Sequence, residues 1–296
     1  MTIWNSYIIP QTLNELFYLL DENSSSSIVA GGTDLLLEIQ QGHHAPVDTL
    51  IDVTRLPELT CLEIRAGRLF IGAAVPLKLV STSSLVQEHA RALAESTGQI
   101  GGPQVRAVGT LGGNVGHALP AGDGAISLLA LDARAEVATR NGCREVPLAV
   151  LYKGPGESTL LPREEVITGF YLQTALPGEA SAFSRVMRPQ GVALPVLNMA
   201  AWAAVKDGRI KSARIAVGPS GPIPGRAVAV EQSLAGMEVT AIDYDVLFSV
   251  LHETVKFRSS ALRASSTYRD QLAEVLLKRV LNKTMERAAQ TTREAR

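Results

Sequence analysis

The sequence predicts an α+β fold, and three patterns in it point to that class. Apolar runs at residues 28–30 and 47–53 flank a helical pattern, which is the order of a β-α-β unit. Short alternating segments joined by turn residues then predict hairpins at 63–72 and 134–147. In the last third a group of strands precedes a group of helices, which is typical of α+β architecture.

The chain is long enough for more than one domain. Its 296 residues exceed the usual single-domain length of ~100–200 residues, so two or three domains are expected. The composition changes near Pro177 and Gly178, where we place a domain boundary.

The first elements have local start and stop signals. Thr12 is the expected N-cap of a helix, and Glu15 is placed to complete a capping box. After a polar loop, the strand at 28–30 enters Gly31-Gly32, and the following helix ends at Gly42. The apolar face of the first helix is expected at Leu13, Leu16, Phe17 and Leu20.

The middle of the chain alternates hairpins with helices, and it contains one long irregular segment, residues 152–163, that is a candidate lid. Its expected elements are the hairpin turning at Ala66-Gly67, a helix from Ser84 to about Thr97, a buried helix at 125–131, the hairpin turning at Asn141-Gly142, and a strand at 165–173.

The last third predicts an antiparallel sheet followed by helices. Strands are expected at 183–187, 196–206 and 209–217, with a tight turn at Asp207-Gly208. Helices are expected at 227–234, 241–257 and 267–289, and the inward face of the last one is predicted to be Leu272, Val275, Leu276, Arg279 and Val280.

Bulk properties argue against several functions. A net charge of −1 leaves no basic excess for nucleic acid. No leader pattern or membrane-length apolar run occurs, so a soluble, cytoplasmic chain is expected. Cys61 and Cys143 are too few for a disulfide framework or an iron–sulfur cluster. His43 and His44 lack further ligands at metal-binding spacing, so no metal site is expected.

Two glycine-rich stretches carry the strongest functional signal. Residues 100–123 are interpreted as a loop around a phosphate-bearing cofactor, in which Gly109, Gly112 and Gly113 allow φ > 0 and close approach. At residues 27–36 a strand, Gly-Gly and a helix follow in the order that aims N–H groups at a pyrophosphate. Tight turns of an α/β core are the alternative. Neither stretch is a G-x-G-x-x-G or P-loop motif.

These stretches also carry a family resemblance. AGGTDLL (30–36), IGGPQVRAVGTLGGN (100–114), PAGD (120–123) and the terminal SSTYRDQLAEVLLKRVL (265–281) resemble the FAD (medium) subunits of molybdenum hydroxylases, above all those of bacterial xanthine dehydrogenases. The resemblance implies a PCMH-type FAD-binding domain of two α/β subdomains at 1–176 (about 1–56 and 57–176). It implies a CO dehydrogenase flavoprotein-like C-terminal domain at 177–290.

The resemblance further implies FAD as cofactor. Residues 28–35 would line the pyrophosphate and ribityl region of FAD, and residues 110–114 would line its other side. Asp123 would accept hydrogen bonds from hydroxyls of the adenosine part, and Ile100 would lie beside the flavin. Asp34 and Asp123 are alternatively helix N-terminal residues, and Arg106 contacts either the pyrophosphate or an acidic neighbour. The implied cofactor-binding residues are Ile28, Val29, Ala30, Gly31, Gly32, Thr33, Asp34, Leu35, Ile100, Thr110, Gly112, Gly113, Asn114, Asp123 and Ile167.

The implied function is electron transfer within a cytoplasmic heterotrimer that oxidises CH or CH2 groups. Electrons would come from a molybdopterin-binding large subunit through a [2Fe–2S] small subunit, and would leave through FAD to NAD⁺, oxygen or a quinone. Two departures stand out: Ser184 replaces a lysine of the family, and Val192 replaces an acid, with Arg185 or Arg188 as substitutes. A stand-alone flavin oxidoreductase and a decayed flavin-fold scaffold are the alternatives. No catalytic residue is identified.

Overall fold

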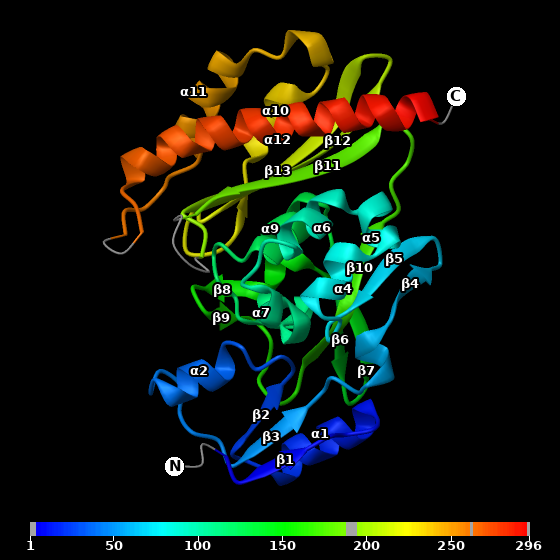
Figure 1. Ribbon diagram of the computed structural model, residues 1–296, viewed down its shortest axis with the longest axis vertical. Coiled ribbons are helices and arrows are strands. Elements are labelled where there is room, and N and C mark those ends of the chain that lie inside the picture. Colours follow the sequence, from blue (N-terminus) through cyan, green and yellow to red (C-terminus); the bar gives the residue numbers. More distant parts are fainter. Residues whose placement is uncertain (1–3, 188–193, 261–262, 295–296) are drawn as a thin grey trace.

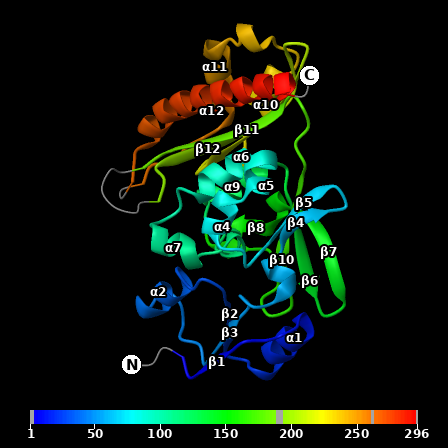
Figure 2. The ribbon, with the colours of Figure 1, turned by 45° about the vertical axis from the view of Figure 1, so that its right-hand side comes forward.

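The computed structural model describes residues 4–187, 194–260 and 263–294, and it confirms the α+β class. The described residues form four sheets, and the three larger ones follow one another along the long axis of the molecule (Figure 1); a second view shows the same order (Figure 2).

The N-terminal sheet is parallel and has the strand order β1-β3-β2. Thr12 caps the first helix as predicted, accepting from the Glu15 N–H at 3.1 Å, but the Glu15 carboxylate receives the N–H of Gln11. The strand β1 is not foreseen because three residues give too short a pattern. The elements are β1 (Ser6–Ile8), α1 (Leu13–Glu22), β2 (Ser26–Val29), α2 (Leu35–Gln40) and β3 (Thr49–Asp52).

The middle sheet is antiparallel and has the order β4-β5-β10-β6-β7. Both predicted hairpins are present, and positive φ at Ala66 and Gly67 makes the first turn. The elements are α3 (Pro57–Thr60), β4 (Leu62–Arg65), β5 (Arg68–Gly72), α4 (Leu77–Thr82), α5 (Ser84–His89), α6 (Arg91–Thr97), α7 (Pro103–Val108), α8 (Leu111–Gly116), α9 (Asp123–Ala130), β6 (Arg134–Thr139), β7 (Gly142–Pro147), η1 (Leu148–Leu151), β8 (Tyr152–Gly154), β9 (Glu157–Ser158) and β10 (Val166–Gln173).

The single helix expected at 84–97 is wrong, because the chain leaves helical geometry at Ala90, with φ −142° and ψ 51°. A contact from the C-terminal sheet accounts for the break: Ser181 Oγ accepts the Ala92 N–H at 3.0 Å and so satisfies an N–H at the start of α6. The first of the two helices, α5, begins at Ser84; its N-cap is Ser83, whose side chain makes no capping bond.

The candidate lid at 152–163 is a small ribbon, β8-β9, rather than a structureless loop. The side chain of Tyr152 is buried, the Gly156 N–H donates to the Ala118 carbonyl at 3.0 Å, and Arg163 donates to the Leu20 carbonyl. Contacts therefore fix both ends of this segment.

The C-terminal sheet is antiparallel, in the order β11-β12-β13-β14, and α12 lies along it (Figure 1). The predicted inward face of α12 is wrong at Val275, which is 50% exposed, and at Arg279, which is also exposed; Ala273 and Leu277 are buried instead. The elements are β11 (Glu179–Val186), β12 (Leu197–Lys206), β13 (Arg209–Gly218), β14 (Gly225–Arg226), α10 (Val228–Leu234), η2 (Val239–Ala241), α11 (Tyr244–Thr254) and α12 (Ser266–Glu294).

The C-terminal sheet packs on α6 and α9 of the middle region. Glu95 of α6 accepts the Phe183 N–H at 2.9 Å and also pairs with Arg287 of α12, while Arg214 of β13 donates to the Ala130 carbonyl at 3.0 Å. These bonds fix the C-terminal sheet above the end of the second glycine-rich stretch.

Candidate cofactor site

The first glycine-rich stretch is an open turn between β2 and α2. Gly32 has φ +65°, a conformation that favours glycine. Among the described residues, none accepts a hydrogen bond from the five backbone N–H groups of residues 31–35, and the Asp34 side chain makes no capping bond. Unpaired N–H groups at the start of a helix are suited to an anion.

The second stretch is not the loop that the sequence predicts, because it folds into α7 and α8. Gly109 has φ −62° and Gly112 and Gly113 lie within α8, so none of them uses positive φ. The N–H groups of Leu111 and Gly112 donate to Val75 and Ala73 carbonyls, and that of Gly113 donates to Thr110 Oγ1. The predicted use of positive φ at these three glycines is therefore wrong, and the N–H groups of residues 111–113 already have acceptors within the protein. Close packing accounts for two of the glycines: a Cβ would lie 2.9 Å from the Val105 carbonyl oxygen at Gly109 and 2.6 Å from Ala73 at Gly112.

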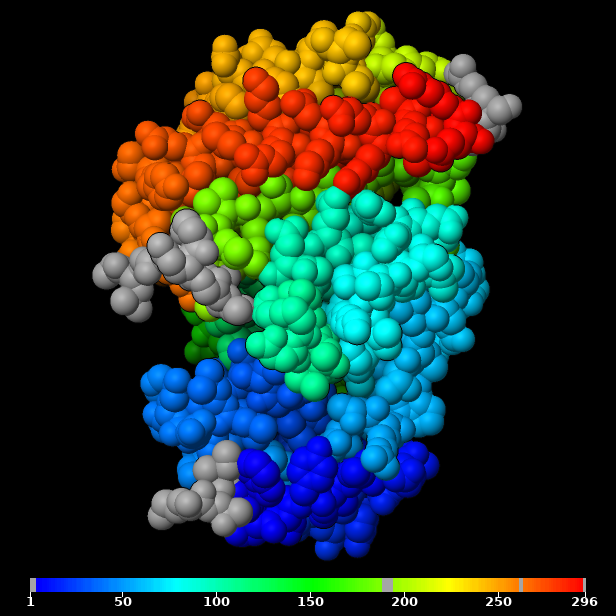
Figure 3. Space-filling view, viewed as in Figure 1, coloured from blue at the N-terminus to red at the C-terminus, as the bar shows by residue number. Residues whose placement is uncertain are grey.

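The two stretches meet through Gly31. A Cβ at Gly31 would lie 2.3 Å from the Val108 carbonyl oxygen and 2.7 Å from the Gly109 Cα. In the same region Thr33 Oγ1 lies 3.8 Å from the place of a Cβ at Gly109. Figure 3 shows the teal segment of α7 directly above the blue segment of α2 on this face. The structure thus brings together the two stretches that the sequence assigns to one cofactor.

Polar residues of the second stretch fix its helices. Thr110 is buried and caps α8 through its bond to the Gly113 N–H at 3.1 Å. Asn114 Oδ1 accepts the Ala125 N–H at 3.3 Å, which joins α8 to the start of α9. A Cβ at Gly124 would lie only 2.7 Å from that oxygen, so this glycine permits the close approach.

Asp123, the first residue of α9, is held by the C-terminal domain. Its carboxylate accepts from Arg185 Nη1 at 2.5 Å and from Asn198 Nδ2 at 2.6 Å, and its side chain is 4% exposed. Burial raises the pKa of the Asp123 carboxyl, while Arg185 and Asn198 act to lower it. The Arg185 side chain is itself 6% exposed, so the two charges form a buried pair.

Sequence reasoning missed Asn198 and left Arg185 as one of two substitutes for the missing lysine. The signal for Arg185 was its position two residues after Phe183, on a strand whose alternate residues face inward. Nothing local marked Asn198. The other positions in question, Arg188 and Val192, lie outside the described residues.

The remaining predicted residues are close to these elements. Ile167 is 8% exposed on β10, and the next residue, Thr168, accepts the N–H of Ala73, whose own carbonyl accepts from Gly112. Ile100 is half-buried. Arg106 donates to the Ile100 and Gly101 carbonyls at 3.1 and 2.6 Å, so it pins its own turn through backbone groups and not through an acid.

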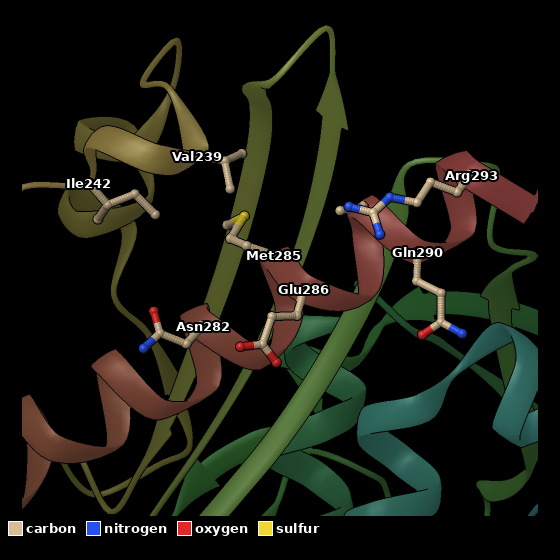
Figure 4. Close-up of a pocket in the computed structure, with 8 residues that line it drawn as sticks. Val239, Ile242, Asn282, Met285, Glu286, Gln290 and Arg293 are labelled. Atoms are coloured by element: carbon tan, nitrogen blue, oxygen red, sulfur yellow. The ribbon is translucent and has the colours of Figure 1, made fainter.

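Other features of the described chain are separate from this site. No three His, Cys, Asp or Glu side chains in the described part of the chain are arranged so that they could hold a metal ion. Among the described helices, none combines the length and apolar character that crossing a membrane requires. A groove of about 570 Å³ between η2 and α12 contains none of the predicted cofactor residues (Figure 4).

Comparison with known proteins gives consistent matches over most of the chain. The family model "FAD binding domain in molybdopterin dehydrogenase" matches residues 3–172, and "CO dehydrogenase flavoprotein C-terminal domain" matches residues 181–284. The nicotinate dehydrogenase FAD-subunit of Eubacterium barkeri is 28% identical, covering 93% of this chain and 94% of its own. The xanthine dehydrogenase FAD-binding subunit of Escherichia coli O157:H7 is 28% identical, covering 95% and 96%.

A solved structure agrees with these matches. A chain of carbon monoxide dehydrogenase from Hydrogenophaga pseudoflava superposes with a TM-score of 0.88 at 26% identity, covering 96% of this chain and 98% of that one.

Proposed function

This chain belongs to the family of FAD-binding domains of molybdopterin dehydrogenases, and we propose that it is the FAD-binding electron-transfer subunit of a xanthine dehydrogenase-like molybdenum hydroxylase. The family membership rests on the matched models and on relatives that align over more than nine-tenths of the chain. The proposal concerns the residues that hold FAD, the partners that deliver electrons, and the acceptor that takes them.

The single observation that carries the proposal is the run of unpaired N–H groups at residues 31–35. They lie at the end of β2 and the start of α2, opposite the Val108-Gly109 backbone. A pyrophosphate carries negative charge and accepts several hydrogen bonds, so it would satisfy these donors and favour the positive end of the helix. The donors present therefore fit the pyrophosphate end of FAD.

The roles of individual residues follow from this placement. Thr33 offers a hydroxyl beside the unpaired N–H groups, and among the described residues that hydroxyl donates to the Asp34 carboxylate at 3.4 Å. Asp123, with Arg185 beside it, is proposed to meet FAD where the middle and C-terminal regions join. The full proposed set is the one that the family resemblance implies: Ile28 to Leu35, Ile100, Thr110, Gly112, Gly113, Asn114, Asp123 and Ile167.

The proposed partners supply the chemistry that this chain lacks. We propose a molybdopterin-binding large subunit that oxidises CH or CH2 groups, and a small [2Fe–2S] subunit that passes electrons on singly. Bound FAD would accept these electrons and deliver them as a pair to NAD⁺ or another acceptor. The domains are proposed to divide at residue 177, into 1–176, with subdomains at about 1–56 and 57–176, and 177–290.

The visible spectrum and the acid-released flavin test this proposal. The chain is purified alone and again after coexpression with its proposed large and small partners. We expect FAD at about one per chain, and flavin bleaching by xanthine only in the coexpressed complex. Absence of FAD from both preparations contradicts the cofactor assignment. Bleaching of the isolated chain by a small substrate contradicts the electron-relay assignment.

A further inference from the structure

A second cavity lies between the middle region and the segment that leads into α12. Its volume is about 190 Å³. Its lining residues include three prolines, two arginines and two serines: Pro120, Pro155, Pro219, Arg258, Arg269, Ser259 and Ser260. The walls therefore combine rigid apolar residues with two cations and two hydroxyls.

Arg269 is the central group of this cavity. Its residue is 4% exposed, although arginine is rarely buried without a partner. One guanidinium nitrogen donates to the Arg258 carbonyl, and its buried Nε has no hydrogen-bond partner in the described chain. Burial and the nearby charge of Arg263 lower the pKa of Arg269. A buried cation in this state is costly unless a counter-charge joins it.

The protein supplies no such counter-charge among its described residues. Neither Arg258 nor Arg269 makes an ion pair there. Two acids stand nearby on α12, but Asp270 and Glu274 face His252, at 3.7 and 2.7 Å. Ser259 is also engaged, since its hydroxyl accepts the Ser266 N–H at 2.9 Å. The positive charges of Arg258 and Arg269 at the cavity therefore have no paired carboxylate among the described residues.

We propose that this cavity binds the phosphate group of a small-molecule ligand, with the Arg258 and Arg269 guanidinium groups and the Ser260 hydroxyl as donors. Guanidinium groups bind phosphate through paired, charge-assisted hydrogen bonds, which distinguishes them from a general positive patch. The cavity is smaller than pockets that enclose whole cofactors, which span roughly 300–1,000 Å³, so it holds one end of a larger ligand or a free phosphate.

The cavity lies close in sequence to one end of the proposed FAD site. Pro120 lies three residues before Asp123, and a Cβ at Gly218, just before Pro219, would lie 2.6 Å from the Pro120 carbonyl oxygen. A nucleotide whose phosphate occupied the cavity would therefore lie near the Asp123 end of that site; this part rests on the function proposed above. Free inorganic phosphate is the second source of the same chemistry.

Titration calorimetry on the FAD-loaded full chain tests the inference. The probes are inorganic phosphate and NAD⁺, at an ionic strength held constant with chloride. Arg258→Gln removes an exposed cation of the cavity, and Lys211→Gln removes an exposed cation of β13 as the matched control. We expect wild-type protein to bind phosphate, Arg258→Gln to weaken that binding about tenfold, and Lys211→Gln to leave it within about twofold.

The outcomes separate the two sources. Competition of NAD⁺ with phosphate, with the same dependence on Arg258, assigns the cavity to a nucleotide; phosphate binding that NAD⁺ leaves unchanged assigns it to free phosphate. No phosphate binding to wild-type protein, or equal weakening by both variants, overturns the inference. FAD content is measured in the same samples: a chain without FAD contradicts the proposed function, whereas a FAD-loaded chain that ignores phosphate contradicts this inference alone.

Discussion

The two glycine-rich stretches have similar compositions but differ in where their backbone N–H groups donate. In the first, at residues 31–35, the backbone N–H groups have no acceptor among the described residues. In the second, at 109–113, the N–H groups of residues 111–113 already donate within the protein, and the glycines approach Ala73 and the first stretch. Glycine content alone therefore indicates only that another group approaches the backbone closely. The hydrogen-bond partners of the backbone N–H groups indicate whether that group is a ligand or another part of the protein.

The largest expected effect concerns the end of the second stretch, where Asp123 is paired. Arg185→Met leaves that carboxylate buried without its cation, so we expect the free energy of unfolding to fall by about 3–5 kcal/mol. Because burial raises the pKa of Asp123 above its ordinary value of 3.8 and Arg185 no longer lowers it, the variant should recover part of this loss as the pH falls through the raised folded-state pKa toward 3.8. Below 3.8 the unfolded carboxyl is protonated as well, so no further recovery is expected.

Urea unfolding across pH measures this effect, and the double variant Arg185→Met with Asp123→Asn serves as its control. The double variant should regain much of the lost stability at neutral pH, since no buried charge remains. Equal stability of the single and double variants would contradict a buried charge pair at this position.

The contact between the two stretches gives the next effect. Gly31→Ala places a methyl group 2.3 Å from the Val108 carbonyl oxygen. The clash can be relieved only if the backbone moves at residue 31 or at Val108. We expect a loss of about 3 kcal/mol in unfolding free energy, together with loss of FAD from the purified chain. Gly116→Ala, where no atom lies within 4 Å, is the matched control and should retain both FAD and stability. FAD retention by Gly31→Ala at full occupancy would break the link between the two stretches.

A pair of glycine substitutions then separates packing from conformation. In Gly112→Ala the new Cβ lies 2.6 Å from the Ala73 Cβ and carbonyl oxygen, which should destabilise the FAD-free chain by about 1–3 kcal/mol. In Gly32→Ala the cost is the positive φ of +65°, about 1 kcal/mol, since its close neighbour is the flexible end of Leu36.

The two glycine variants should therefore rank oppositely in two measurements. Urea unfolding without FAD should show Gly112→Ala as the weaker protein, and fluorescence titration with FAD should show Gly32→Ala as the weaker binder. The same ranking in both measurements would contradict the division of roles.

The parts of the fold that are determined by residues adjacent in the sequence were predictable. The turns at Ala66-Gly67 and Asp207-Gly208 and the cap at Thr12 follow from chemistry within a few residues. The break at Ala90 was not predictable, because its cause is Ser181, far along the chain. Both glycine-rich stretches could be located from the sequence. The conformation of the second was predicted wrongly because the carbonyls that accept its N–H groups, those of Ala73 and Val75, come from another segment.

The smallest effects come from two threonines, one in each stretch. Thr110 caps α8, so Thr110→Val should lower the unfolding free energy by about 1 kcal/mol, and its FAD affinity should fall by less than that of Thr33→Val because its hydroxyl already accepts the Gly113 N–H. Thr33 has only a long 3.4 Å bond to Asp34, so Thr33→Val should change stability by less than about 0.5 kcal/mol. Its FAD affinity should fall by about fivefold to tenfold, the value of one hydrogen bond to a phosphate. Valine matches threonine in shape, so each variant serves as the control for the other. Fluorescence titration with FAD measures the affinity of each variant, and urea unfolding measures its stability. If Thr110→Val lost affinity and Thr33→Val kept it, the second stretch and not the first would be the principal contact to the cofactor.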